Sequence, residues 1–420
     1  MTSVQLTVLL FALLHTLFEV FLYFLNLKNL HRMRDDQPDY TESLMDKDKW
    51  QKATDYSAAK LKLSIIQEFA GFLIFIVTIL FLIPYVFGNW DATANNGILE
   101  SSFVCVILLL SIQLPGLVFD WFSQFKIENR FGFNKSNNKL WVSDKLKENG
   151  LGLIFGTLIF ALIVWLYRTL SEFSSFWWAI AFAIFFLIQL SLMILWPKFI
   201  LPLFNKLSPL EDGELRTRLL DLADRSGFAA QTIEIIDGSK RSSHSNAYFT
   251  GFGKFRRIVL YDTLLEQMEH NEVEAVLAHE IGHYKMGHIP KRLILSFILG
   301  LAGFGGLHYA LSWSGLYTGL GLNHEYVGSI SVLLVAMILI VPNFTYWLSP
   351  VSNFFSRKHE YEADHFAAKS MKEGGSLVNA LTKLYRENLS HPLPHPLLVF
   401  FHYSHPTYYD RVDTLVKLEG

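Results

Sequence analysis

Seven long apolar segments constrain the fold of this 420-residue sequence more than any other feature. A helix needs roughly 20 residues to cross a bilayer. Lipid offers the backbone no hydrogen-bond partner, so each segment is expected to be a helix. Only 18% of the residues are charged, below the about 25% of a typical soluble protein. The expected spans are residues 4–27, 64–88, 98–122, 151–170, 175–197, 293–315 and 326–349.

The charges in the loops predict an orientation. Residues 28–63 carry eight Lys or Arg, residues 123–150 carry six, and residues 198–292 carry many more. The alternate loops, 89–97 and 316–325, carry none. Since positive loops stay in the cytoplasm, the N-terminus is expected outside or in the lumen. The three charged loops and the C-terminal tail are expected to face the cytoplasm.

Four polar side chains lie in or at the ends of these spans: Glu19, Glu68, Asp120 and Gln189. A charge at mid-membrane costs at least a few kcal/mol, so such residues usually face a bundle interior or water. Snorkelling, or a place at the membrane interface, is the alternative.

Composition excludes some classes of site. The single cysteine, Cys105, lies inside an apolar run, so no intramolecular disulfide and no cysteine-rich zinc site can form. A net charge of −2 gives no support for nucleic-acid binding.

Two polar segments, 205–290 and 350–420, look like folded structure. The second is expected to be helical, with an interruption at the proline-rich residues 391–396. Helical spacing of apolar residues, strand-like runs and turn signals predict the elements of the first. They are a helix at 210–226, strands at 232–236, 246–249 and 257–261, and a helix at 270–288.

The most specific motif is the pentad His279-Glu280-Ile281-Gly282-His283, an H-E-x-x-H sequence. On a helix, residues four apart share a face, so both imidazoles can reach one zinc ion. Glu280 lies beside the first ligand, where it can take a proton from the attacking water. Asn271 is the expected N-cap of this helix. An exposed helix with two ordinary histidines is the alternative.

A catalytic zinc site needs a third protein ligand. His288 is the nearby candidate. The pattern that supplies a third histidine requires glycine at position 286 and histidine at position 289, where this chain has Met286 and Ile289. That class of metalloprotease is therefore excluded.

A glutamate from a later helix is the other common third ligand. Glu360 and Asp364 are four residues apart and share a helix face, whereas Glu362 lies about 200° around from Glu360. If one face serves the metal, Glu360 binds it and Asp364 can hold a ligand histidine by its second nitrogen. Glu362 is then a solvent-exposed or structural carboxylate. A merely charged helix is the alternative.

These motifs, in this order and with seven spans, resemble the type I CaaX prenyl protease family of integral-membrane gluzincins. The resemblance covers nearly the whole chain, and its strongest parts are 240–290 and 350–412. Further matching segments are Arg241–Phe249, Arg257–Leu265, His405-Pro406 with Asp410-Arg411, and Gly132-Phe133-Asn134.

The resemblance implies a role for each matching residue. One zinc ion per chain would be bound by His279, His283 and Glu360. Glu280 would be the general base, and Asp364 would hold a ligand histidine. His405 would take part in catalysis. The residues that would contact substrate are Asn246, Ala247, His405 and Arg411.

The resemblance also implies the fold and the activity. The fold is mainly α, a ring of seven tilted transmembrane helices around a water-filled chamber, capped by a cytoplasmic zinc domain with a small β-sheet. The activity is removal of the C-terminal tripeptide from prenylated CaaX proteins. The enzyme would be a monomer, in the endoplasmic reticulum of a eukaryote or the inner membrane of a bacterium. The expected division is 1–204 (spans one to five), 205–290 and 350–420 (the two parts of the zinc domain) and 291–349 (spans six and seven).

Two other functions stay open at this point. An HtpX-like quality-control protease, cutting other membrane proteins, has similar zinc motifs but fewer spans. A non-enzymatic transporter or scaffold with a structural metal would account for polar residues in the spans. A closed structural site normally has four protein ligands, and the sequence offers three.

Overall fold

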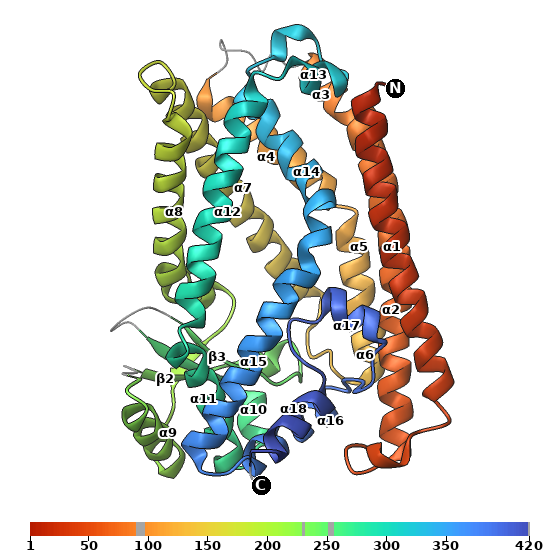
Figure 1. The fold of residues 1–420 in the computed structure, drawn as a ribbon, viewed down its shortest axis with the longest axis vertical. Helices are drawn as coiled ribbons and strands as arrows, with labels where there is room; N and C mark the ends of the chain where they lie inside the picture. The colour runs from red at the N-terminus through yellow and green to blue at the C-terminus, as the bar shows by residue number, and fades with distance from the viewer. Residues whose placement is uncertain (90–96, 229–231, 251–255, 419–420) are drawn as a thin grey trace.

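The computed structural model describes residues 1–89, 97–228, 232–250 and 256–418. Long helices run along the molecule, and a small sheet with shorter helices gathers at the end that carries the C-terminus (Figure 1). The N-terminus lies at the opposite end. The predicted loop at 89–97 falls mostly outside the described residues.

The first half of the chain supplies the first long helices. Proline shapes two of them, because it lacks the N–H that continues a helix: Pro115 follows α4, and Pro197 lies within η4. The helices are α1 (Ser3–Met33), α2 (Lys47–Val77) continued by η2 (Thr78–Leu82) and α3 (Ile83–Asn89), α4 (Ile98–Gln113), α5 (Gly116–Phe122), η3 (Ser123–Glu128), α6 (Asn129–Phe131), α7 (Asn138–Leu170) and α8 (Trp177–Leu195) continued by η4 (Trp196–Ile200) and η5 (Leu201–Leu203).

The second half adds two more long helical stretches. α12 (His288–Leu311) begins five residues before the predicted span at 293. α14 (Ile330–Thr345) continues almost without a break through η9 (Tyr346–Leu348) into α15 (Ser349–Met371). This stretch therefore carries the chain from the apolar part of the molecule into the polar end. α13 (Ser314–Gly319) and η8 (His324–Tyr326) connect α12 to α14.

Among the described residues, six helical stretches are long and apolar enough to cross a membrane, or seven if one bent pair counts as a span. That pair joins α4 to the segment Gly116–Phe131 at an angle of 42°. The straight span predicted at 98–122 is thus bent, and its break falls at Leu114 and Pro115.

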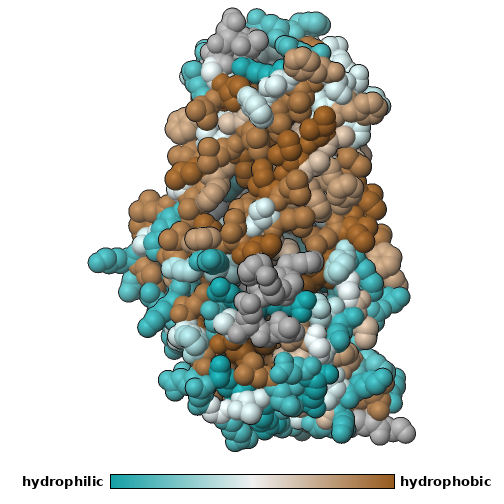
Figure 2. Space-filling view, turned by 90° about the vertical axis from the view of Figure 1, so that its left-hand side faces the viewer, coloured by the Kyte–Doolittle hydropathy of each residue, from teal (hydrophilic) through white to brown (hydrophobic). Residues whose placement is uncertain are grey.

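Apolar side chains cover the outside of the long helices. Figure 2 shows a broad hydrophobic belt over the upper part of the molecule, with hydrophilic residues at both ends. Phe24 of α1, Leu187 of α8 and Ile298 of α12 are each more than half exposed on the outside of the long helices. A surface of this kind suits contact with lipid. Inside the belt, Val106 of α4, Val164 of α7 and Leu333 of α14 belong to one buried core.

The N-terminus is fastened to the loop region between α12 and α14. The Thr2 hydroxyl donates to the Gly319 carbonyl, and Gln5 Nε2 donates to the Leu320 carbonyl at 3.3 Å. These contacts lie at the end of the bundle opposite the sheet (Figure 1). The two ends of the chain therefore lie at opposite ends of the molecule.

The polar end contains a four-stranded sheet in the order β1-β2-β4-β3. β2 and β4 are parallel, and β3 pairs antiparallel with β4 in the register Ala247↔Leu260. β3 is an edge strand. The three predicted strands are present within one residue of their expected bounds, whereas β1, with Pro209 at its end, was not predicted. The strands are β1 (Leu207–Pro209), β2 (Thr232–Ile236), β3 (Ala247–Thr250) and β4 (Arg257–Tyr261).

Helices surround this sheet, and one predicted helix start and one predicted N-cap are wrong. α9 begins at Glu214 rather than Leu210, because the Leu210 N–H pairs with Ile233 of the sheet at 2.9 Å. α11 is capped by Glu269 rather than Asn271, through a reciprocal pair of hydrogen bonds with Glu272. The shorter elements of this end and of the loops are η1 (Asp39–Thr41), α9 (Glu214–Arg225), η6 (Gly238–Lys240), α10 (Asp262–Gln267), α11 (His270–Lys285), α16 (Gly375–Glu387), α17 (Pro396–His402) and α18 (Tyr408–Val416).

The helix predicted at 270–288 ends three residues early, at Lys285. Gly287 has a φ of +67°, a left-handed conformation that ends α11 after Lys285 and that glycine adopts without strain. α12 then starts at His288 in a new direction.

Both polar segments share one hydrophobic core. Leu260 and Leu277 from the first segment pack in the same buried cluster as Ala367 and Leu381 from the second. The two segments thus form one body, although α12 and α14 lie between them in the sequence.

Candidate metal centre

Two helices bring three potential metal ligands together at the polar end. α11 supplies His279 and His283, and α15 supplies Glu360. The two carboxylate oxygens of Glu360 each lie 3.3 Å from one histidine Nε2. One ligand atom from each residue lies within 4.8 Å of the others. This spacing suits a single small cation.

The Glu360 carboxylate is the observation that tests whether a metal fits. Its Oε2 is buried and accepts no well-formed hydrogen bond from any described residue, although His279 Nε2 is 3.3 Å away. A buried carboxylate oxygen without a partner is costly. A cation between Glu360 and the two imidazoles would remove that cost, and two nitrogens with a carboxylate oxygen form a donor set that zinc accepts.

A glycine inside the H-E-x-x-H pentad permits this approach of α11 to α15. A Cβ on Gly282 would stand 2.9 Å from Ala363 Cα and 3.0 Å from Ala363 O. Distances that short to backbone atoms would push the helices apart. Gly282 therefore sets how closely Glu360 can approach the two histidines.

His279 is held from behind by a buried ion pair. Its Nδ1 lies 2.8 Å from Asp364 Oδ1, and the Arg411 guanidinium donates two hydrogen bonds to Asp364, at 2.8 and 2.5 Å. Asp364 is fully buried. A carboxylate on the far nitrogen fixes the orientation and tautomer of a ligand histidine. The structure thus places Asp364 where it can orient His279, with Arg411 behind it.

His283 is held differently, by another histidine. His288 Nδ1 lies 2.9 Å from His283 Nδ1, and His288 Nε2 lies 2.9 Å from Glu362 Oε2. The His288 ring is 1% exposed and stacks on His359 at 4.0 Å. If His283 uses Nε2 for a metal, its Nδ1–H donates to His288, which donates in turn to Glu362.

His288 therefore lies behind a ligand rather than beside the other ligand atoms, and Glu362 is its structural partner. The sequence offers His288 only as a candidate third ligand, and its place behind His283 is not predicted. The available signal was the left-handed Gly287, which turns the chain so that His288 faces back toward His283.

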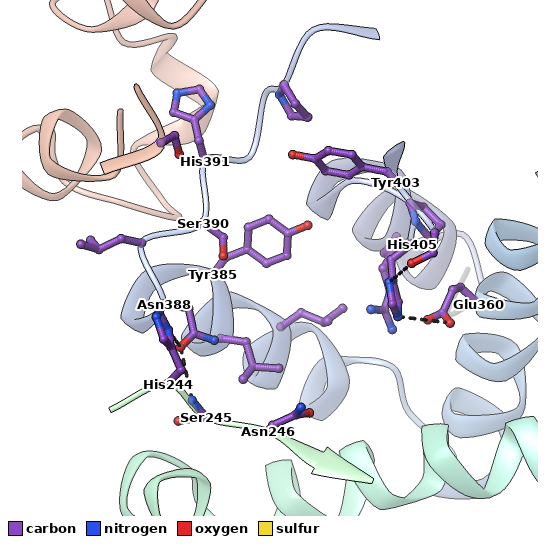
Figure 3. Close-up of a pocket in the computed structure, with 18 of the residues that line it drawn as sticks. His244, Ser245, Asn246, Glu360, Tyr385, Asn388, Ser390, His391, Tyr403 and His405 are labelled. Atoms are coloured by element: carbon purple, nitrogen blue, oxygen red, sulfur yellow. Dashed lines mark hydrogen bonds and ion pairs between the residues drawn. The ribbon is translucent and has the colours of Figure 1, made fainter. Parts of the chain in front are cut away.

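Glu280 and His405 complete the metal end of a cavity of about 800 Å³. Glu280 lines this cavity beside both histidines, and burial raises the pKa of its carboxyl above the usual range. His405 comes from the turn between α17 and α18. Its Nε2 lies 3.5 Å from Glu360 Oε1, and its Nδ1 lies 3.0 Å from Ser404 Oγ (Figure 3).

The edge strand β3 starts in the same cavity, where Asn246 and Ala247 line the wall. The Asn246 carbonyl accepts from Tyr261 N–H at 3.1 Å. Since backbone groups alternate sides along a strand, the carbonyl of Ala247 faces the open edge. The Ala247 N–H is taken by Asn246 Oδ1 at 2.8 Å. An extended peptide could therefore pair with β3 beside the metal ligands.

The comparison with known families gives two matches that together span most of the chain. The family model "Peptidase family M48" matches residues 209–419. The family model "CAAX prenyl protease N-terminal, five membrane helices" matches residues 26–206.

Full-length relatives agree. CAAX prenyl protease 1 of Saccharomyces cerevisiae is 36% identical, with 90% of this chain and 88% of that protein covered. CAAX prenyl protease 1 homolog of Arabidopsis thaliana is 33% identical, with coverage of 94% and 93%. The crystal structure of S. mikatae Ste24p matches with a TM-score of 0.88 and 32% identity over 99% of both chains. The chain belongs to peptidase family M48, among the CAAX prenyl proteases of type 1.

The far end of the cavity in this M48 chain holds a second polar cluster that the sequence reasoning did not predict. The Tyr56 hydroxyl donates to Glu128 Oε1 at 2.8 Å, and His244 Nε2 lies 3.3 Å from Glu128 Oε2. His244 Nδ1 lies 3.0 Å from Asn388 Oδ1, and the ring stacks on Phe133 at 4.0 Å. Segments far apart in sequence meet here, from α2, η3, the loop before β3 and the end of α16, so no local pattern signals the cluster.

The four polar residues in or at the ends of the spans do not all occupy the same kind of position, and both buried and exposed positions occur. Glu19 is buried, and its Oε2 lies 3.0 Å from His402 Nε2. Asp120 is half exposed and lies 3.3 Å from Lys145 Nζ. Gln189 is exposed on α8, and Glu68 is partly exposed on α2. Of the four, Glu19 is the one that the structure places firmly in the interior.

Proposed function

We propose that this chain is a membrane zinc peptidase that removes the C-terminal tripeptide from prenylated CaaX proteins. The observation that carries the proposal is the buried Glu360 carboxylate between the two imidazoles of the H-E-x-x-H pentad, whose Oε2 receives no well-formed hydrogen bond from the described residues. The substrate follows from similarity to relatives whose printed name is CAAX prenyl protease 1.

We assign one zinc ion to His279, His283 and Glu360. Bound zinc supplies a Lewis acid that polarises the scissile carbonyl and lowers the pKa of a water molecule to about 7. Asp364 orients the ring of His279, and His288 orients the ring of His283. Arg411 acts mainly through Asp364, to which its guanidinium donates two hydrogen bonds, and its Nη2 also lies 3.3 Å from His279 Nδ1.

Glu280 is the general base in this proposal. It takes the proton from the attacking water and returns it to the leaving amine, a role worth about 10²- to 10⁴-fold in rate. His405 faces the cavity beside Glu360 and donates a hydrogen bond to the oxyanion. The open edge of β3 holds the substrate extended, with the Ala247 carbonyl as acceptor and Asn246 at the scissile bond.

The remaining assignments follow from loop charge and from the relatives. We propose that the polar end faces the cytoplasm, because the Lys- and Arg-rich loops gather there, as positive loops do. The N-terminus would then be lumenal, in the endoplasmic reticulum membrane. The zinc domain comprises 205–290 and 350–420, and the protein acts as a monomer.

The test uses purified, zinc-loaded protein in detergent with a farnesylated CaaX peptide and its unprenylated twin. Mass spectrometry should show one cut, directly after the prenylated cysteine. The Glu280→Gln variant should retain zinc and cleave neither peptide. Cleavage by that variant would refute the general-base assignment. Zinc-loaded protein that leaves the farnesylated peptide intact would refute the proposed substrate and favour an HtpX-like activity on other membrane proteins.

A further inference from the structure

A lysine and an arginine, Lys60 and Arg411, line the described part of the cavity, and they are held in opposite ways. Arg411 is 8% exposed and is bound to Asp364 by two hydrogen bonds. The Lys60 side chain is 53% exposed, and its nearest carboxylate, Glu128 Oε1, is 4.0 Å away. Lys60 is therefore the cation that a ligand in the cavity can reach.

Contacts place Lys60 at the far end of the cavity. Its Nζ lies 3.4 Å from the Tyr56 hydroxyl, which lies 3.4 Å from His244 Nε2. Figure 3 shows His244 and Asn388 on one side of the cavity and Glu360 on the other, with Asn246 between them in this view. Along the chain, His244 lies three residues before Ala247, the first residue of the edge strand. Lys60 thus lies beyond the start of β3, away from the metal ligands.

The edge strand links this position to the direction of the substrate. A peptide that pairs antiparallel with β3 runs opposite to it, so its C-terminal side points toward His244. An extended chain advances about 3.3–3.4 Å per residue. Three residues after the scissile bond therefore cover roughly 10 Å and end near the His244 cluster. This step rests on the proposed function, which supplies a leaving group of three residues.

We propose that Lys60 and Asn388 form the subsite for the C-terminal carboxylate of the substrate, and so set the released peptide at three residues. Asn388 Oδ1 faces two protein groups, the Ser245 N–H at 3.3 Å and His244 Nδ1 at 3.0 Å. Its NH₂ group therefore points away from them and can donate to the ligand. Hydrogen bonds from an ammonium to a carboxylate are stronger than neutral ones.

Among the residues that the structure describes at this end of the cavity, Glu128 supplies a carboxylate, and both of its oxygens already face protein groups. Oε1 accepts from the Tyr56 hydroxyl, and Oε2 faces His244. Glu128 is largely buried, whereas Lys60 is not. Glu128 thus keeps Tyr56 and His244 oriented and draws the ammonium to this end of the cavity, while leaving it open to a ligand.

The test compares two farnesylated CaaX peptides that differ only at the C-terminus, a free acid and a carboxamide. The wild-type protein should cleave the acid with about tenfold higher kcat/KM, a ratio typical of one charge-assisted hydrogen bond. Lys60→Met should lose about tenfold on the acid and stay within twofold on the amide. Lys60→Glu should prefer the amide. The matched control is Lys62→Met, two residues along α2 on an exposed position outside the cavity, and should keep the wild-type preference.

Peptide length gives a second readout of the same subsite. A free-acid peptide with one more residue after the cysteine moves its carboxylate past Lys60. The wild-type rate should fall about tenfold, toward that of the amide, while Lys60→Met should treat the two lengths alike.

Equal cleavage of acid and amide by the wild type would overturn the carboxylate subsite and leave the peptidase proposal standing. An equal loss on both peptides in Lys60→Met, with zinc content and melting temperature unchanged, would also overturn it. Failure of the zinc-loaded wild type to cleave either peptide would refute the proposed function, and the subsite with it.

Discussion

The two ends of the cavity use charge in different ways. At the metal end, Asp364 and Arg411 are both buried and bind each other through two hydrogen bonds. At the far end, Lys60 is mostly exposed, with its nearest carboxylate oxygen 4.0 Å away. A buried charge must be paired, and losing its partner is costly. The metal end is therefore built to hold a geometry, whereas the far end can still bind a charged ligand.

The same contrast recurs between the two histidines proposed as metal ligands. His279 has an anion behind it, Asp364, which is itself neutralised by Arg411. His283 has a histidine behind it, and the nearest negative charge, on Glu362, is one ring further away. The first arrangement should stabilise bound metal more strongly, because the anion contacts the ligand directly.

The largest effects are expected from two substitutions at the metal end. One should remove zinc binding, and the other should remove catalysis while zinc stays bound. Glu360→Gln should lose both zinc and activity, since one of the three ligands loses its charge. Glu280→Gln should keep zinc and still lose about 10²- to 10⁴-fold in kcat. Zinc content by plasma mass spectrometry, alongside peptide cleavage, distinguishes the two. Equal zinc loss in both variants would mean that Glu280 belongs to the ligand set.

A smaller effect should rank the two contacts that support the histidines, Asp364 with His279 and His288 with His283. Loss of an outer partner of a metal ligand typically costs about 10- to 100-fold in metal affinity. We expect Asp364→Asn near the upper value and His288→Phe near the lower one. Glu362→Gln should be weaker still, since it acts through His288. Competition for zinc with a chelator measures all three, and a larger loss in His288→Phe than in Asp364→Asn would reverse the ranking.

The smallest of the expected effects concerns the packing that supports the metal end. Gly282→Ala places a Cβ 2.9 Å from Ala363 Cα, and overpacking of this kind costs about 1–3 kcal/mol. Gly303→Ala is the matched control, since a Cβ there meets nothing within 4 Å. Thermal unfolding in detergent should show a lower Tm for Gly282→Ala alone. An unchanged Tm would show that α11 and α15 can separate freely.

Features set by local sequence could be predicted, and features set by tertiary contact could not. The lengths of the apolar runs predicted the spans. The spacing of four residues predicted that His279 and His283 share one helix face, and the pattern of the later helix made Glu360 the candidate third ligand. The bend at Pro115 and the direct passage from α14 into α15 depend on packing between helices. His288 owes its position to the turn that precedes it, and Lys60 owes its position to partners distant in sequence. Neither role could be assigned from spacing alone.

The central claim is an open catalytic metal site with three protein ligands, and zinc X-ray absorption spectroscopy tests it most directly. The spectrum should contain two imidazole nitrogens at about 2.0–2.1 Å and oxygen ligands at about 2.0–2.2 Å, the latter from Glu360 and solvent. Glu360→Gln, which should not retain zinc, should give no zinc signal. Three or four imidazoles around the metal, from His288 or His405 joining the set, would show a closed structural site and contradict the account.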